Sequence, residues 1–225
     1  MAEQPYAIQM RGVTKTFGSV TANKDVDLNL RQGEILALLG ENGSGKTTLM
    51  NMLSGIYKPD RGDILVEGKP VSIDSPQDAK RLGIGMVHQH FKLVDVFSAA
   101  DNIWMGQEKT GLLLGRSRFS RVEEMAKRFG FDLDPRKKVA NMAVSEKQTL
   151  EIVKVLCYGA KVIILDEPTA VLTVQEIEKL FGVLRRMKEE GHSIIIITHK
   201  LNEVMEISDR VAILRKGEYI GTVDT

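Results

Sequence analysis

An eight-residue segment in the first quarter of the chain has the residue types and spacing of a phosphate-binding loop. Gly40-Glu41-Asn42-Gly43-Ser44-Gly45-Lys46-Thr47 matches the pattern G-x-x-x-x-G-K-[ST], and Thr48 follows it. Glycines let the backbone turn and aim its N–H groups at phosphate oxygens, and a helix that starts here adds a favourable dipole. Lys46 is expected to reach the β- and γ-phosphates of a nucleotide, and the Thr47 hydroxyl to hold Mg²⁺. The alternative is a glycine-rich turn with no function.

Four more polar side chains each follow an apolar segment that predicts a buried strand. Gln89 comes two residues after Val87, the pair Asp166-Glu167 follows Leu165, and His199 comes two residues after Ile197. Ligands of open parallel sheets bind at the carboxyl ends of the strands, so we expect these side chains and the loop to share one edge. The acidic pair could instead be a solvated strand end, Gln89 a polar strand-end residue and His199 a structural histidine.

Histidine and cysteine add no metal site or disulfide to this set. His88 and His90 flank Gln89, but two histidines with one residue between them and no further ligand set make a poor zinc site. Cys157 is the only cysteine, which excludes an internal disulfide and is typical of a reducing compartment.

The elements that must position these residues follow from hydrophobic periodicity. We predict early strands in the regions 8–11 and 26–30 and at 35–39, a strand at 62–68 that ends in a Gly-Lys-Pro turn, and a short helix at 76–82. Residues 91–158 are mainly helical in pattern and predict an inserted lobe. Strands at 162–165, 194–197 and 211–214 then alternate with helices, which predicts a parallel sheet with crossover helices.

Composition excludes several other classes of protein. The 225 residues include 31 Lys or Arg and 30 Asp or Glu, and the net charge of +1 and the 5% aromatic content give no reason to expect nucleic-acid binding. The longest apolar run, 35–39, is far shorter than the ~18 residues of a membrane span. The first twelve residues lack the apolar core of a signal peptide. The length fits one large domain or a domain with a lobe.

With Asp166-Glu167-Pro168-Thr169 after its strand, and with Gln89 and His199 in this order, the chain resembles the ATP-binding cassette (ABC) ATPases over nearly its whole length. The resemblance implies an α/β fold of the P-loop NTPase, ABC-ATPase type: a mixed sheet core with an N-terminal antiparallel β region and an inserted α-helical lobe. It implies one domain over 1–225, with 1–90 and 159–225 as core plus β region and 91–158 as lobe.

The resemblance also implies ATP and Mg²⁺ as ligands and a role for each site residue. Asp166 is expected to orient Mg²⁺ through its water shell, and Glu167 to act as general base or to orient the attacking water. His199 is expected to contact the γ-phosphate, and Gln89 to join Mg²⁺ and the water to the segment that meets a membrane partner. Phe17 occupies the place of an aromatic under the adenine ring, although it could instead be a core aromatic of a hairpin.

One family motif departs from its usual form. The signature LSGGQ, which binds the ATP held by a partner cassette, aligns with Met142-Ala143-Val144-Ser145-Glu146. Ala143 stands in place of the serine that meets the γ-phosphate and Ser145 in place of a glycine, while Glu146 adds negative charge. Thr173 stands where the family has the D-loop aspartate. These changes predict a weak signature; the alternatives are tolerated drift, or an alignment that is off by two residues.

These details most resemble the amino-terminal cassette of tandem ATPase subunits in simple-sugar and nucleoside importers. The resemblance implies a peripheral protein at the cytoplasmic face of the cell membrane, with a second cassette and permease subunits as partners and an extracytoplasmic solute-binding protein as an indirect one. The segment 91–103 would receive a cytoplasmic helix of the permease, unless its apolar residues are lobe core. We expect one competent ATP site and one degenerate site. A nucleotide-gated dimerisation module with little hydrolysis, or a non-transport cassette, are the alternatives.

Overall fold

The structure, a computed structural model, describes residues 5–105 and 116–225, and its elements alternate as the periodicity predicts. Along the chain they are β1 (Tyr6–Phe17), β2 (Val20–Arg31), β3 (Ile35–Leu39), α1 (Lys46–Leu53), β4 (Arg61–Val66), β5 (Lys69–Val71), α2 (Pro76–Arg81), β6 (Ile84–Val87), α3 (Ala99–Trp104), α4 (Arg116–Phe129), a 3₁₀ turn (Val139–Asn141), α5 (Val144–Cys157), β7 (Val162–Asp166), α6 (Val174–Glu189), β8 (Ser193–Thr198), α7 (Leu201–Ile207), β9 (Arg210–Arg215) and β10 (Glu218–Asp224).

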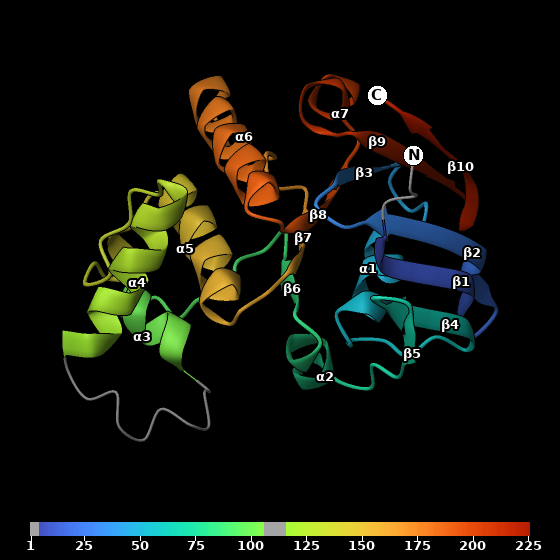
Figure 1. Cartoon of the computed structure of the whole chain (residues 1–225), viewed down its shortest axis with the longest axis horizontal. Coiled ribbons are helices and arrows are strands. Elements are labelled where there is room, and N and C mark those ends of the chain that lie inside the picture. The colour runs from blue at the N-terminus through green and yellow to red at the C-terminus, as the bar shows by residue number, and fades with distance from the viewer. Residues whose placement is uncertain (1–4, 106–115) are drawn as a thin grey trace.

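Two sheets organise these elements (Figure 1). The central sheet has the order β10-β9-β3-β8-β7-β6, and its pairs are parallel except for the β9–β10 hairpin at one edge. The second sheet, β2-β1-β4-β5, is antiparallel throughout. This mixed architecture confirms the predicted fold class, and it brings the carboxyl ends of β3, β8, β7 and β6 to one edge.

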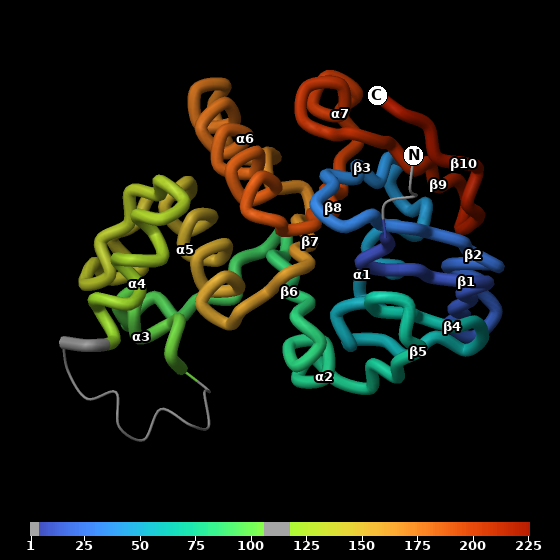
Figure 2. Tube along the Cα trace, viewed as in Figure 1, coloured from blue at the N-terminus to red at the C-terminus, as the bar shows by residue number. Residues whose placement is uncertain are grey.

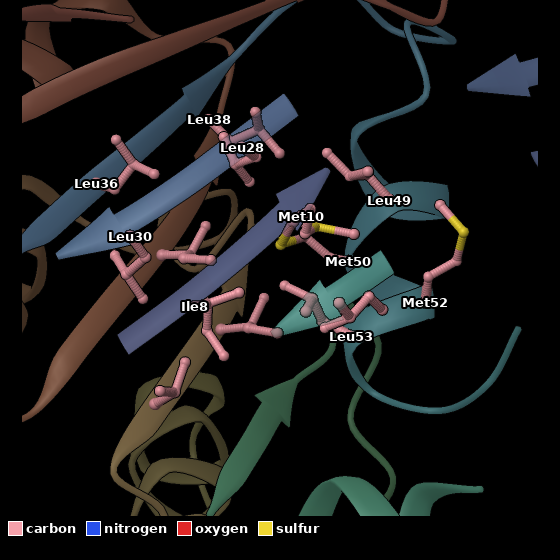
Figure 3. Packing of buried hydrophobic residues seen from close by; sticks show 14 of the residues in the cluster. Ile8, Met10, Leu28, Leu30, Leu36, Leu38, Leu49, Met50, Met52 and Leu53 are labelled. Carbon is pink, nitrogen blue, oxygen red and sulfur yellow. The ribbon is translucent and has the colours of Figure 1, made fainter. Parts of the chain in front are cut away.

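The main core lies where helix α1 meets the two sheets. Figure 3 shows Leu49, Met50 and Leu53 of α1 close to Ile8 and Met10 of β1, and all five are almost completely buried. Strands β7 and β8 carry uninterrupted apolar runs because both faces of the central sheet are covered, by this core on one side and by α5 and α6 on the other.

Helices α3, α4 and α5 form a group with a core of its own on one side of the sheet (Figure 2). Ala99, Ile103, Val122, Leu150 and Val153 are buried together there. Helix α5 also belongs to the core beneath α6, because its Ile152, Val155 and Leu156 face the central sheet. The helical group therefore joins the sheet mainly through α5. Within the described residues, no helix combines the length and the apolar character that crossing a membrane requires.

One sequence-based expectation about strands is wrong, and one strand was not predicted. The predicted Gly-Lys-Pro turn is instead the start of β5, and the turn lies at Glu67-Gly68, both with positive φ. Pro70 is tolerated because β5 is the edge of its sheet, where a missing N–H breaks no ladder. Strand β10 was not predicted; it has few apolar residues and follows a turn at Lys216-Gly217.

Candidate functional site

The predicted phosphate loop leaves β3 and enters α1, and its glycines are set by close backbone contacts. Gly43 and Gly45 have φ values of 80° and 96°, a region that other residues rarely adopt. A Cβ on Gly45 would lie 2.4 Å from the carbonyl oxygen of Ala22 on β2, and one on Gly40 would lie 2.3 Å from that of Leu214 on β9. The loop is thus pressed against strands of both sheets.

Lys46 folds back into this loop. Its Nζ donates to the carbonyl oxygens of Gly40 (2.7 Å) and Glu41 (2.9 Å), and the residue is 5% exposed. Burial lowers the pKa of Lys46, while the carboxylates of Glu167 and Asp166 act in the opposite direction. The ammonium therefore stands between the loop carbonyls and the acidic strand end.

The loop offers unused hydrogen-bonding capacity that fits a phosphate group. Among the described residues, the buried Oγ of Ser44 has no hydrogen-bond partner, although the Ser44 carbonyl accepts from the Gly217 N–H at 3.0 Å. The amides at the start of α1 have no capping side chain, since the N-cap residue is Gly45. Asn42 and Thr47 are exposed and Thr48 is half-buried. A buried lysine, open amides and a free hydroxyl together suit a polyanion.

Three of the predicted polar residues meet at the carboxyl ends of neighbouring strands. Glu167 accepts from Nε2 of Gln89 at 3.2 Å through one oxygen, and its other oxygen lies 3.1 Å from Nδ1 of His199. Glu167 itself has φ of 47°, a left-handed conformation that costs a non-glycine residue roughly 1–2 kcal/mol. Its N–H bonds to the carbonyl of Ile197 on β8, which helps to hold this conformation.

Asp166 lies behind this cluster, at the end of β7, and connects it to the phosphate loop. It is 6% exposed and accepts a hydrogen bond from the Thr47 side chain. Burial raises the pKa of Asp166; the Thr47 bond and the Lys46 charge oppose that effect, and the neighbouring Glu167 adds to it. Oxygen ligands from Thr47, Asp166 and Gln89 are the donor types that Mg²⁺ prefers. These residues therefore fit the predicted metal.

Phe17 lies apart from these contacts, at the end of β1. Its ring is 43% exposed and meets Tyr57 edge-on with centroids 5.1 Å apart, while Lys15 Nζ lies 5.6 Å from the ring centroid. The exposed face excludes the alternative of a core aromatic in the hairpin. The adenine contact stays a prediction.

The predicted signature segment forms the start of α5. Among the described residues, no hydrogen bond or ion pair joins it to residues 40–48 of the same chain. Ala143 is the N-cap, and because alanine has no side-chain oxygen only half of a capping box forms: Glu146 accepts from the Ala143 N–H at 2.8 Å. Glu146 also pairs with Lys137 at 2.7 Å, and this hydrogen bond lowers the pKa of Glu146. Its charge is thus offset within the chain. Met142 is buried and Val144 exposed.

Thr173 and Ser145, two residues at which the chain departs from the family motifs, form hydrogen bonds at the start of α6. Thr173 is the N-cap of α6 and forms a full capping box with Glu176, whose carboxylate lies 3.0 Å from Thr173 Oγ1. Ser145 also donates to Glu176, so it links the start of α5 to the start of α6. The hydroxyl of Thr173 thus performs the capping that an aspartate would perform.

Sequence reasoning missed two residues that form hydrogen bonds with the backbone of the phosphate loop. Asn23 on β2 is fully buried, and its Nδ2 donates to the Gly45 carbonyl at 3.3 Å. Gly217, in the β9–β10 turn, holds the Ser44 carbonyl. Asn23 lies on β2 and Gly217 in a turn, both outside the motif along the chain, and an isolated asparagine or glycine carries no recognisable signal.

Comparison with known proteins agrees with this geometry. Residues 23–170 match the family described as ABC transporter. The chain is 48% identical over 219 residues to the nucleoside import ATP-binding protein NupA of Lactococcus lactis subsp. cremoris, and 49% identical over 221 residues to the guanosine import ATP-binding protein NupO of Bacillus subtilis. These matches cover 96% and 97% of this chain but 43% of each relative, so the chain spans less than half the length of the curated relatives it matches.

Solved structures give the same result. CbiO1 from Clostridium perfringens, part of the ABC transporter complex cbiONQ, superposes with a TM-score of 0.84 at 30% identity, covering 98% of this chain and 89% of that one. A nucleotide-free ATP-binding cassette from an ABC transporter gives 0.87 at 21% identity, covering 97% and 91%. The family match extends over the phosphate loop, Gln89, Asp166 and Glu167. The chain belongs to the ABC transporter family, as one of its ATP-binding cassettes.

Proposed function

We propose that the chain hydrolyses ATP as a cassette of an importer for a sugar or a nucleoside, at the cytoplasmic face of the membrane. The observation that carries this proposal is the convergence of Lys46, Asp166 and the Glu167–Gln89–His199 cluster at one sheet edge. The import ATP-binding relatives support the transport role. The solute is chosen by other subunits, so sugar and nucleoside remain joint candidates.

In the proposed mechanism the chain supplies charge, orientation and a proton acceptor. Loop amides and Lys46 hold the phosphates, and Thr47, Gln89 and Asp166 hold Mg²⁺, which supplies charge neutralisation for the phosphate oxygens when bound. Glu167 takes a proton from the water that attacks the γ-phosphorus, as the bond to the bridging oxygen breaks and ADP leaves. His199 and Gln89 hold the Glu167 carboxylate through its two oxygens, so it faces one direction.

The Glu167→Gln variant tests this assignment. Gln keeps the size of the side chain but cannot accept the proton, so turnover should fall about a hundredfold or more while ATP binding persists. Glu218→Gln, at an exposed carboxylate on β10, is the matched control and should hydrolyse ATP like the unmodified chain. Equal turnover in Glu167→Gln and Glu218→Gln would support the nucleotide-gated dimerisation module instead.

We further propose that a second cassette completes the site and that the two sites of the pair are unequal. Ala143 offers no hydroxyl to a partner's γ-phosphate, and Ser145 donates to Glu176 within the chain. This chain's own loop and Glu167 cluster retain all their parts. In the assembled pair, Lys46→Ala here should therefore abolish more ATP hydrolysis than the equivalent change in the partner; equal losses would contradict asymmetry.

The permease surface is proposed to begin at the first half of the segment 91–103. Val96 and Phe97 are 70% and 40% exposed, whereas Ala99, Ala100 and Ile103 belong to the helical core. The second half of the segment therefore belongs to the lobe core, and the exposed first half supports a permease contact there.

A cavity of about 330 Å³ adjoins the same segment. Its lining includes three lysines and one glutamate, Lys80, Lys92, Lys154 and Glu151. A cytoplasmic permease segment with apolar side chains and a carboxylate would suit this surface, since it would cover Val96 and Phe97 and offset the excess positive charge. An indirect link to a solute-binding protein would run through that permease.

A further inference from the structure

A buried carboxylate with no predicted role lies just behind the Glu167 cluster. Glu203, in the first turn of α7, is 7% exposed. Its Oε1 accepts from the Thr169 hydroxyl at 2.6 Å and lies 2.9 Å from Lys200 Nζ, and its Oε2 accepts from the Thr198 hydroxyl at 3.0 Å. Burying a carboxylate costs desolvation free energy, and hydrogen-bond donors such as these compensate that cost.

The two threonines lie next to the two reacting groups, Thr169 in the loop after β7 and Thr198 as the last residue of β8. Thr169 comes two residues after Glu167, beyond the end of β7, and Thr198 immediately precedes His199 at the end of β8. Both threonines are 3% exposed, and both donate to the same carboxylate. Lys200 completes the arrangement, because its N–H donates to Thr198 Oγ1. Glu203 makes no hydrogen bond with Glu167 or His199 among the described contacts, so it acts on them only through these neighbours.

We propose that Glu203 is a positioning residue: it clamps the loops after β7 and β8 together and so sets the contact between Glu167 and His199. The inference rests on the proposed ATP hydrolysis. Without the carboxylate, two buried hydroxyls lose their common acceptor, and the side-chain link between the segments that follow β7 and β8 is weakened, although the backbone bond from Glu167 to Ile197 remains. The Glu167–His199 distance of 3.1 Å would lengthen, and the base would lose one of the two contacts that orient it.

The test uses pairs of threonine variants of the full chain, assembled with the partner cassette that completes its site. Thr169→Val and Thr198→Val keep the side-chain shape but remove the hydroxyl. Thr169→Ser and Thr198→Ser keep the hydroxyl. The valine variants and Glu203→Gln should lower kcat for ATP about tenfold or more, as expected for a small misplacement of a reacting group, with the Kd for ATP changed less than about twofold. The serine variants should recover most of the turnover. Thr222→Val, on β10, is the matched control.

A spectroscopic readout separates positioning from general destabilisation. The chain has four histidines, and the imidazole signals of His199 can be assigned by comparison with His199→Gln. In Glu203→Gln the His199 signals should shift while those of His192, which bonds to the Met187 carbonyl, stay in place. This measurement does not depend on turnover, and the valine variants provide it if Glu203→Gln fails to fold.

The inference is overturned if Glu203→Gln and both valine variants retain kcat and the His199 signals, or if kcat and ATP affinity fall in parallel. Its failure is distinct from failure of the proposed function. If the unmodified chain hydrolyses ATP, Glu167→Gln does not, and the Glu203 and threonine variants keep the unmodified turnover, only the proposed role of Glu203 is wrong. If Glu167→Gln also keeps the unmodified turnover, the proposed hydrolysis is wrong.

Discussion

Replacement of Gly45 by alanine is the most direct test of how the phosphate loop is held. At this position the backbone has φ of 96°, and the added Cβ would lie 2.4 Å from the Ala22 carbonyl oxygen and 2.7 Å from Nδ2 of Asn23. Gly43 is the matched control in the same loop. Its φ is 80°, but nothing lies within 4 Å of its added Cβ. The two variants therefore share backbone strain and differ in steric overlap.

The expected magnitudes follow from these two terms. An alanine in left-handed backbone costs roughly 1–2 kcal/mol. Ordinary contact begins near 3.4 Å, so the loop or β2 must move by about 1 Å at Gly45, and overlap of this kind costs roughly 1–3 kcal/mol more. For a chain of this size about 1 kcal/mol corresponds to 2–4 °C in Tm. Gly45→Ala should then lower Tm by about 10 °C, and Gly43→Ala by about 4 °C.

Thermal unfolding followed by circular dichroism gives the two Tm values, and titration with ATP gives the binding constants. Gly45→Ala should also weaken ATP binding more than Gly43→Ala, because the Gly45 carbonyl accepts from Asn23 and cannot move without displacing the start of α1. Equal Tm values for the two variants, or a Gly45→Ala variant as stable as the unmodified chain, would refute the idea that contact with β2 fixes the loop.

Three further predictions concern ionisable groups. Burial, together with the charges of Lys92 and Lys154, lowers the pKa of His88 to about 4. Between pH 6.5 and pH 4 the unfolded chain therefore binds a proton at His88 that the folded chain does not bind. The free energy of unfolding should decrease as the pH is lowered across this range. Urea titrations at pH 7 and pH 5 should reveal a smaller fall in His88→Gln than in the unmodified chain, and an identical fall would contradict the assignment. Burial raises the pKa of Cys157 to about 11, so iodoacetamide at pH 8 should alkylate it about a hundredfold more slowly than a free cysteine; a rate like that of free cysteine would show the thiol to be accessible. Arg210→Met removes the guanidinium that lies 3.3 Å from the buried Glu34 carboxylate, and it should lower the free energy of unfolding in urea by about 3 kcal/mol. Glu34→Gln added to the same chain should recover part of that loss. An Arg210→Met variant as stable as the unmodified chain would show that the ion pair does not contribute.

The parts of this molecule that were predictable are those with a local signal. The loop at 40–47 was found because its glycines and lysine stand at fixed spacing, and β7 and β8 because strands covered on both faces carry apolar runs such as VIIL and IIII. The same reasoning placed the site at one sheet edge, since parallel strands end together. The loop's location between β3 and α1 is confirmed, whereas the roles of Glu167 and His199 stay predictions.

The parts that escaped prediction depend on contacts between distant segments. Strand β5 contains Pro70, and only its place at a sheet edge makes that proline acceptable. Strand β10 has strand-favouring residue types but no apolar run, because Gly221 and Thr222 separate Tyr219 and Ile220 from Val223, and its pairing with β9 is not visible in the sequence. Glu203 is recognisable only once β7 and β8 are adjacent, because its two hydroxyl donors lie about thirty residues apart along the chain.

The β9–β10 turn changes what counts as a minimal nucleotide-binding fragment. Gly217 donates its N–H to the Ser44 carbonyl and accepts from the Lys24 N–H at 2.9 Å, so one residue of the turn ties the phosphate loop to β2. A Cβ on Gly217 would lie 2.7 Å from the Ala22 carbonyl oxygen, so no larger residue fits at this joint without displacement. A fragment that stopped at Arg215 would retain every motif residue and still lose the two backbone hydrogen bonds through which Gly217 connects the phosphate loop to β2. We therefore expect such a fragment to hold a phosphate less well than a chain that includes the turn, although both contain the same motif residues.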